Sequence, residues 1–86
     1  MTTTTHRPLH IIAREIRSDF RGKPSWAFAE PYVNAMLSLH DITDNYYEDS
    51  AESVVLYALS NLGTWRGETA KRVKAELKAI LASNKR

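Results

Sequence analysis

Apolar positions recur along much of the chain with the three- and four-residue spacing of amphipathic helices. The first apolar face consists of Leu9, Ile12, Ala13, Ile16 and Phe20. Pro8 suits a first helical position because its missing N–H would have no partner there. Gly22 is typical of the residue that follows a helix end. The pattern predicts a helix over about residues 8–20.

The second apolar pattern contains a proline whose role the sequence leaves open. Ser25 is a candidate cap for a helix that begins at Trp26. Pro31 either kinks that helix or begins a new one at its first position. The apolar face beyond the proline consists of Tyr32, Val33, Met36, Leu37 and His40. We expect this helix to end near His40.

A third helix is predicted after the acidic segment 41–49, which we expect to be a loop. Asp49 and Glu52 have the spacing of a capping box, so the helix is expected to open there. The run 54–62 is apolar nearly all round, which is typical of a central helix. Residues 54–57 alone would also suit a strand, but the cap before them favours a helix.

The fourth helix is expected to run from Trp65 to Ala82, with Thr64 as its N-cap. Its apolar stripe consists of Ala70, Val73, Leu77, Ile80 and Leu81. Glu68 and Arg72 are four residues apart, a spacing at which opposite charges on a helix can pair.

These elements predict an all-α fold, a compact bundle of three to four helices. The short connections favour antiparallel neighbours, and 86 residues are enough for one domain around a modest core. We expect a flexible polar tail at 1–6, a single helical domain at 7–82 and a frayed basic tail at 83–86.

The amino-acid composition restricts the cellular location that we expect for the protein. The chain has no cysteine, which removes disulfides, thiolate nucleophiles and cysteine-based zinc sites and favours a reducing, cytoplasmic location. The threonine run at its start lacks the apolar region of a signal peptide. No apolar run approaches the ~20 residues of a membrane span, so we expect no membrane association.

Charge is segregated although the net charge is only +2. Residues 7–24 carry five basic and two acidic groups, and residues 25–65 carry six acidic groups without any Lys or Arg. Residues 66–86 carry seven basic and two acidic groups. Such a basic, acidic, basic layout influences the choice of partner more than the fold.

The acidic segment has part of the pattern of a calcium loop. The ligand positions of an EF-hand would fall on Asp41, Thr43, Asn45, Tyr47, Asp49 and Glu52. However, the sharp turn at the sixth position requires glycine, and this sequence has Tyr46 there. We therefore predict no metal site, and interpret the segment as solvated acids that cap the next helix.

The same segment is a candidate protein-binding surface. Asp44, Tyr46, Tyr47 and Glu48 combine tyrosine, which is enriched at interfaces, with acids that would suit a basic partner. One core tyrosine and one incidental surface tyrosine would be an equally good explanation. Trp65 and Arg66 are further candidates, because both residue types are enriched at interface hot spots. For Trp65, an aromatic anchor at a helix junction is the better interpretation.

Basic stripes on the first and fourth helices offer an alternative, nucleic-acid binding. The residues concerned are Arg14 and Arg17 on the first helix and Lys71, Lys74 and Lys78 on the fourth. The balanced total charge falls short of a typical nucleic-acid binder, and solvated helix faces would explain the same stripes.

A further clue is the block Gly63-Thr64-Trp65-Arg66-Gly67-Glu68, which lies within 50–81 and follows the segments 11–17 and 31–36. With its Pro-Tyr helix start and its Thr-Trp-Arg-Gly block before a basic helix, the chain resembles small bacteriophage-encoded helical proteins of unknown function. The resemblance implies an intracellular protein that binds a host protein or a phage component.

We therefore expect a small protein-binding module, acting on a host or phage protein, and not an enzyme. The chain has no nucleophile elbow, no Gly-rich phosphate loop and no metalloprotease motif, so no catalytic residues or cofactor are predicted. The alternatives are nucleic-acid binding and a structural, homo-oligomer-forming phage component.

Overall fold

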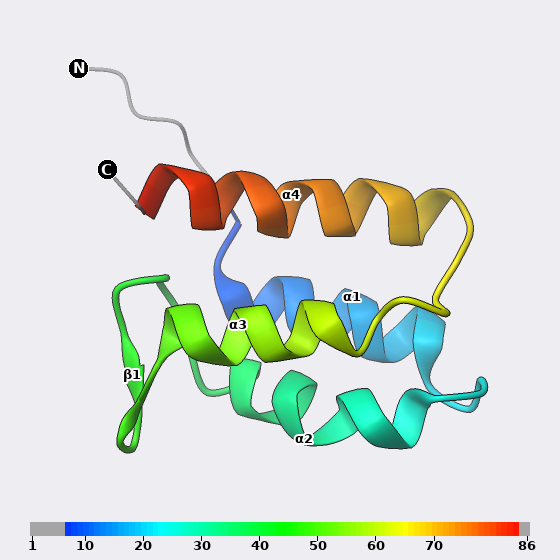
Figure 1. Cartoon of the computed structure of the whole chain (residues 1–86), viewed down its shortest axis with the longest axis horizontal. Coiled ribbons are helices and arrows are strands. Elements are labelled where there is room, and N and C mark those ends of the chain that lie inside the picture. The colour runs from blue at the N-terminus through cyan, green and yellow to red at the C-terminus, as the bar shows by residue number, and fades with distance from the viewer. Residues whose placement is uncertain (1–6, 85–86) are drawn as a thin grey trace.

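Four helices and a short hairpin make up residues 7–84, the part of the chain that this computed structural model describes (Figure 1). The helices are α1 (Leu9–Phe20), α2 (Trp26–Met36), α3 (Ala51–Ser60) and α4 (Glu68–Asn84). Successive helices run in opposite directions (Figure 1). α1 packs against α2 and α4, and α3 packs against the same two helices, so the four enclose one core. The predicted helical bundle with antiparallel neighbours is confirmed.

The strictly all-α class was wrong, because the acidic segment forms a hairpin between α2 and α3. Strands β1 (Asn45–Tyr46) and β2 (Asp49–Ser50) are antiparallel, with Tyr46 opposite Asp49. Two-residue strands carry too little periodicity to be recognised in a sequence. The turn between them also lacks the Asn-Gly or Asp-Gly pair typical of tight hairpins.

α2 is a single helix that begins at Trp26 and contains Pro31 in its interior. The predicted end near His40 was wrong, because the chain turns after Met36. This turn allows the backbone carbonyls of Leu39 and His40 to accept hydrogen bonds from the first N–H groups of α1. The predicted cap was also wrong: Ser25 has a left-handed φ of 75° and makes no side-chain capping bond.

The start of α3 is shifted by one residue from the predicted capping box. Ser50 is the N-cap, and its hydroxyl accepts a hydrogen bond from the backbone N–H of Ser53 at 3.1 Å. The cap is therefore Ser50, not Asp49. The helix itself is confirmed over the apolar run, and the strand alternative for residues 54–57 was wrong.

α4 begins at Glu68, three residues later than predicted, because Gly67 has a φ of 111° that no helix can contain. Thr64 is not the N-cap of α4. Its hydroxyl instead donates a hydrogen bond to the carbonyl oxygen of Pro24 at 3.4 Å. α4 continues to Asn84, so the part of the predicted frayed tail at 83–84 is helical. Residues 1–6 and 85–86, which complete the two predicted tails, lie outside the described residues.

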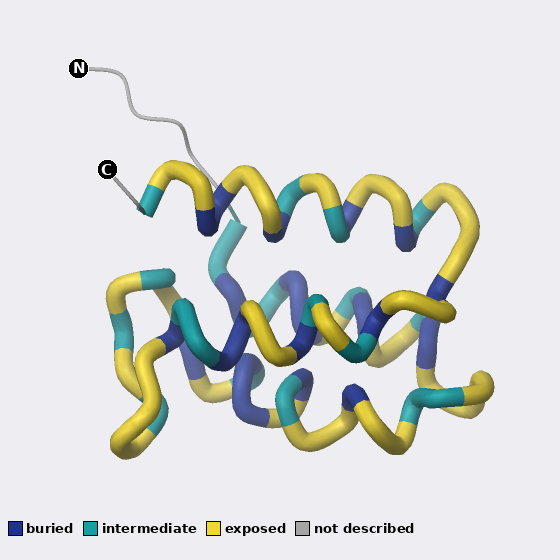
Figure 2. Tube along the Cα trace, in the orientation of Figure 1, coloured by how far each residue is buried: buried dark blue, intermediate teal, exposed yellow. Residues whose placement is uncertain are grey.

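The core is formed by apolar residues from all four helices and their connections (Figure 2). Trp65 and Phe20 are its largest members, each 1% exposed. α3 is not buried all round, since Leu56 and Tyr57 remain 45% and 57% exposed. One side of α3 therefore presents apolar surface to solvent. No helix within residues 7–84 is long and apolar enough to cross a membrane.

Candidate protein-binding site

A hollow of about 430 Å³ lies where α2, α3 and the hairpin meet, and we call it the tyrosine groove. Its lining consists of Pro31, Tyr32, Ala35, Tyr46, Asp49, Val54 and Tyr57. Three of these seven residues are tyrosines and only one is charged. A concave, largely apolar surface with a single fixed charge is the usual form of a binding site.

Packing of α2 on α3 determines the aromatic wall of the tyrosine groove. The rings of Tyr32 on α2 and Tyr57 on α3 stack with their centroids 5.5 Å apart and their planes at 29°. Ala35 on α2 and Val54 on α3 also line the groove, and both are buried. The stacked tyrosines and these two side chains thus form the part of the groove lining that comes from the packing of α2 on α3.

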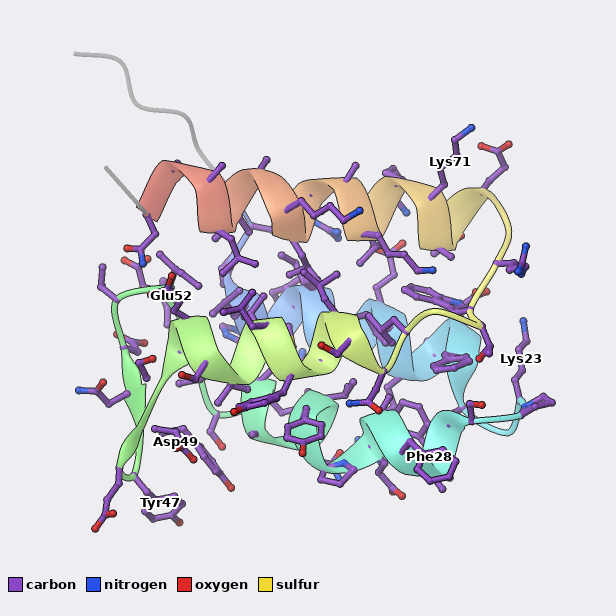
Figure 3. All side chains as sticks on the ribbon, viewed as in Figure 1. Lys23, Phe28, Tyr47, Asp49, Glu52 and Lys71 are labelled. Atoms are coloured by element: carbon purple, nitrogen blue, oxygen red, sulfur yellow. The ribbon has the colours of Figure 1, made fainter. Side chains whose placement is uncertain are left out.

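The hairpin supplies the other wall. Tyr46 and Asp49 are directly opposed in the antiparallel register, so their side chains lie on the same face of the hairpin, and both line the groove. Tyr46 packs against the core, and its ring meets that of Tyr47 edge-on at 4.7 Å. Figure 3 shows Asp49 and Tyr47 together at this end of the bundle.

Tyr47 is the most exposed large apolar residue among the described residues, at 87%, and its φ is 57°. Glycine or asparagine normally occupies such a left-handed turn position, because a bulky side chain is strained there. Exposed aromatic area combined with local backbone strain is more typical of a functional position than of a structural one.

Asp44, another predicted contact residue, has an internal role. Its carboxylate accepts hydrogen bonds from the backbone N–H groups of Asp41 and His40, both at 3.0 Å. These bonds, that of Asp41 above all, lower the pKa of Asp44. The Asp44 carbonyl oxygen also accepts from the N–H of Ala51, which closes the base of the hairpin. Asp44 therefore positions the hairpin, while Glu48 is exposed at its turn.

Trp65 is a core anchor, so its ring is not available to a partner. It is 1% exposed, and its ring stacks on that of Phe20 at a centroid distance of 5.8 Å. Arg66 beside it is exposed. The segment that carries both residues lies at the opposite end of the bundle from the hairpin (Figure 1). The six predicted protein-binding residues thus do not form one surface.

The basic residues predicted on α4 do come together. A second hollow, of about 490 Å³, is lined by Trp65, Arg66, Gly67, Ala70, Lys71, Lys74, Ala75 and Lys78, and we call it the basic hollow. Lys74 Nζ donates a hydrogen bond to the Trp65 carbonyl oxygen at 2.7 Å. Burial, and then the neighbouring charges of Arg66 and Lys78, lower the pKa of Lys74.

The arginines predicted on α1 lie elsewhere. Arg14 and Arg17 line a separate shallow hollow with Ser18, Arg21 and Gly22. The edge of α1 that faces α4 is marked by Glu15, which pairs with Arg72. At 100° per residue, Arg17 lies about 200° around the helix from Glu15. The proposed nucleic-acid surface is therefore divided between two faces of the bundle.

Sequence reasoning missed Tyr32 and Tyr57 as site residues, because each falls on an apolar helix pattern that resembles core. The sequence contained one indication of an exposed apolar surface, because a helix as apolar as α3 in a chain this short cannot bury every side. Within residues 7–84, no group of three or more His, Asp or Glu side chains is positioned to hold a metal ion.

No family model matches the chain, and comparison with curated proteins and with solved structures found no match either.

Proposed function

We propose that this protein is a binding module for another protein, and that the tyrosine groove, extended by Tyr47 at the hairpin turn, is its contact surface. The supporting observation is the concentration of four tyrosines, two of them more than half exposed, around one concave site. Tyrosine provides large contact area with few rotatable bonds, so its ordering on binding costs little entropy.

The shape of the groove suits a short segment of a partner chain. A hollow of about 430 Å³ accommodates a few side chains rather than a whole domain face. A groove formed in advance by packing of α2 on α3 also loses little freedom when it binds. The host or phage identity of the partner, suggested by the resemblance, stays a prediction, as does a cytoplasmic location.

A matched pair of variants on α3 tests the proposal. Tyr57→Ala removes a wall of the groove, whereas Leu56→Ala removes a neighbouring exposed side chain that does not line it. The probe is a bead-displayed library of random nine-residue peptides, selected first on the wild-type protein. We expect selected peptides to lose at least about tenfold in affinity with Tyr57→Ala, the effect of one aromatic hot spot. Leu56→Ala should leave their affinity within about twofold.

Two results would overturn the proposal. One is a library from which no peptide is selected. The other is a set of selected peptides that bind Tyr57→Ala as well as they bind the wild type. Circular dichroism of both variants verifies that the helices remain formed, so a loss of binding is assigned to the groove.

Nucleic-acid binding at the basic hollow is the second candidate. The ion pairs among the described residues involve Arg7 and Arg72, and none involves Arg66, Lys71 or Lys74. An unneutralised cluster of this kind would attract phosphates. Its test is the affinity for a 20-nucleotide DNA over a salt series: binding that weakens steeply with salt and on Lys71→Gln would favour it.

A further inference from the structure

We infer that the occupant of the tyrosine groove is an arginine side chain of the partner. The inference rests on the proposed function and specifies the chemistry of the partner. It combines the charge around the groove, the position of Asp49 within it, and the stacking surfaces of the tyrosines.

Charge at the groove is entirely negative. Every lining residue comes from the stretch 25–65, which contains six acidic groups and no Lys or Arg. Asp49 lines the groove itself, and Glu48 precedes it at the turn. The basic residues of α4 lie on the other side of the bundle, where Figure 3 places Lys71 far from Asp49. A cationic occupant is therefore attracted and an anionic one repelled.

The carboxylate of Asp49 is available to such a cation. Within residues 7–84 it forms no ion pair, whereas the acids on α1 and α4 that face each other are paired with Arg7 and Arg72. A purely apolar occupant would cover Asp49 and remove its hydration without supplying a partner, which costs free energy. A cation that reaches into the groove replaces that hydration with a charge-assisted hydrogen bond.

Arginine fits this lining better than lysine does. Its planar guanidinium can stack on a tyrosine face while its N–H groups donate to a carboxylate, and it is more weakly hydrated than an ammonium. The stacked rings of Tyr32 and Tyr57 provide the aromatic surface, and Asp49 on the hairpin provides the acceptor. The aliphatic part of the side chain would contact Ala35 and Val54.

Two peptide pools separate the charge of the occupant from its shape. Each pool holds nine-residue peptides with random uncharged residues. In one pool the central residue is arginine, and in the other it is citrulline, which has the same length and planar end but no charge. Binding of labelled protein to single beads is measured for the wild type, Asp49→Asn and Glu48→Gln. The last variant removes the same charge from the same hairpin, but at a residue that does not line the groove.

We expect the arginine pool to contain several-fold more binding beads than the citrulline pool. Asp49→Asn should weaken arginine peptides about fivefold, the upper range for a partly exposed ion pair, and Glu48→Gln less than about twofold. Citrulline peptides should respond to neither variant. Equal binding of both pools, or equal effects of the two variants, would overturn the inference.

The outcomes also distinguish this inference from the proposed function. If both pools bind equally and Tyr57→Ala abolishes both, the groove binds a partner but arginine is not its ligand. If neither pool binds but the fully random library yields peptides that depend on Tyr57, the inference fails and the proposed function stands. A second copy of the chain is the competing occupant, and sedimentation of the protein alone tests for it. Self-association that is lost in Tyr57→Ala would assign the groove to a second copy and overturn the inference.

Discussion

The indole Nε1 of Trp65 donates a hydrogen bond to Oδ2 of Asp19 at 2.6 Å. This hydrogen bond joins the segment that connects α3 and α4 to the surface of α1. The two residues are 46 positions apart in the sequence. The Trp65 carbonyl oxygen accepts a second bond, from Lys74 on α4. Trp65 thus joins the segment between α3 and α4 to both α1 and α4. These contacts explain why a tryptophan in a connecting segment is buried.

Loss of the Asp19 acceptor should destabilise the fold. Asp19→Ala leaves a buried indole N–H without its partner, and we expect the free energy of unfolding to fall by about 1–3 kcal/mol. Ser18→Ala, at the adjacent exposed position, should change it by less than about 0.5 kcal/mol. Urea unfolding of the two variants measures both values, and equal values would show that the bond does not stabilise the fold.

A pair of glycines allows a similarly matched test at the start of α4. Gly67 has a φ of 111° and Gly63 has no positive φ, yet an added Cβ would meet nothing within 4 Å at either position. Gly67→Ala should therefore lower the free energy of unfolding by about 1–2 kcal/mol through backbone strain alone. Gly63→Ala should be neutral or slightly stabilising. Thermal unfolding of both variants measures the difference; if Gly67→Ala were as stable as Gly63→Ala, α4 would have to begin differently.

Acid should weaken the contact between α1 and α4. Arg7 donates to both carboxylate oxygens of Glu76, at 3.2 and 3.1 Å from its Nε, and this lowers the pKa of Glu76 from its usual 4.5. Glu15 is affected in the same way by Arg72 first and then by Arg7. The pKa values of Glu15 and Glu76 are lower in the folded state than in the unfolded chain. The ion pairs of these two residues therefore stabilise the fold above pH 4.5, and this stabilisation is lost as the pH falls through the folded-state pKa values.

Glu76→Gln tests this dependence. At pH 7 the variant should be less stable than the wild type by about 0.5–1 kcal/mol, the range for a partly exposed pair. The difference should shrink as the pH falls below 4.5, because the unfolded wild type then binds a proton at Glu76 that the folded state takes up only at lower pH. Glu30→Gln, which alters an exposed residue on α2 that forms no ion pair within residues 7–84, is the matched control for replacing a glutamate by glutamine. A Glu76→Gln deficit that persists unchanged at pH 3 would mean that the ion pair is not its cause.

Local patterns predicted the helices because each depends on neighbours in the sequence. The apolar face of α1 and the stripe of α4 are repeated over several turns, so their existence did not depend on tertiary context. Boundaries were less predictable, because they depend on single backbone conformations. Gly67 delays the start of α4, and Ser50 takes the capping role expected for Asp49.

The groove could not be predicted, because its residues are distant in sequence. Tyr32 and Tyr57 belong to different helices, and their stacking follows only from the way α2 packs on α3. Arg72 shows the same limit: its spacing suggested a pair with Glu68, but the partner is Glu15 on another helix. Of the predicted surface residues, the structure places Tyr46 at the groove and Tyr47 beside it, whereas Trp65 is buried.

The most direct test is a titration of the isotopically labelled protein with a selected arginine-centred peptide, followed by amide correlation spectra. The account predicts that resonances of Tyr32, Asp49 and Tyr57 shift together along one binding curve, while those of Lys71 and Lys78 stay in place. Shifts confined to Lys71, Lys78 and their neighbours would contradict the account, because they would place the contact surface on the basic hollow.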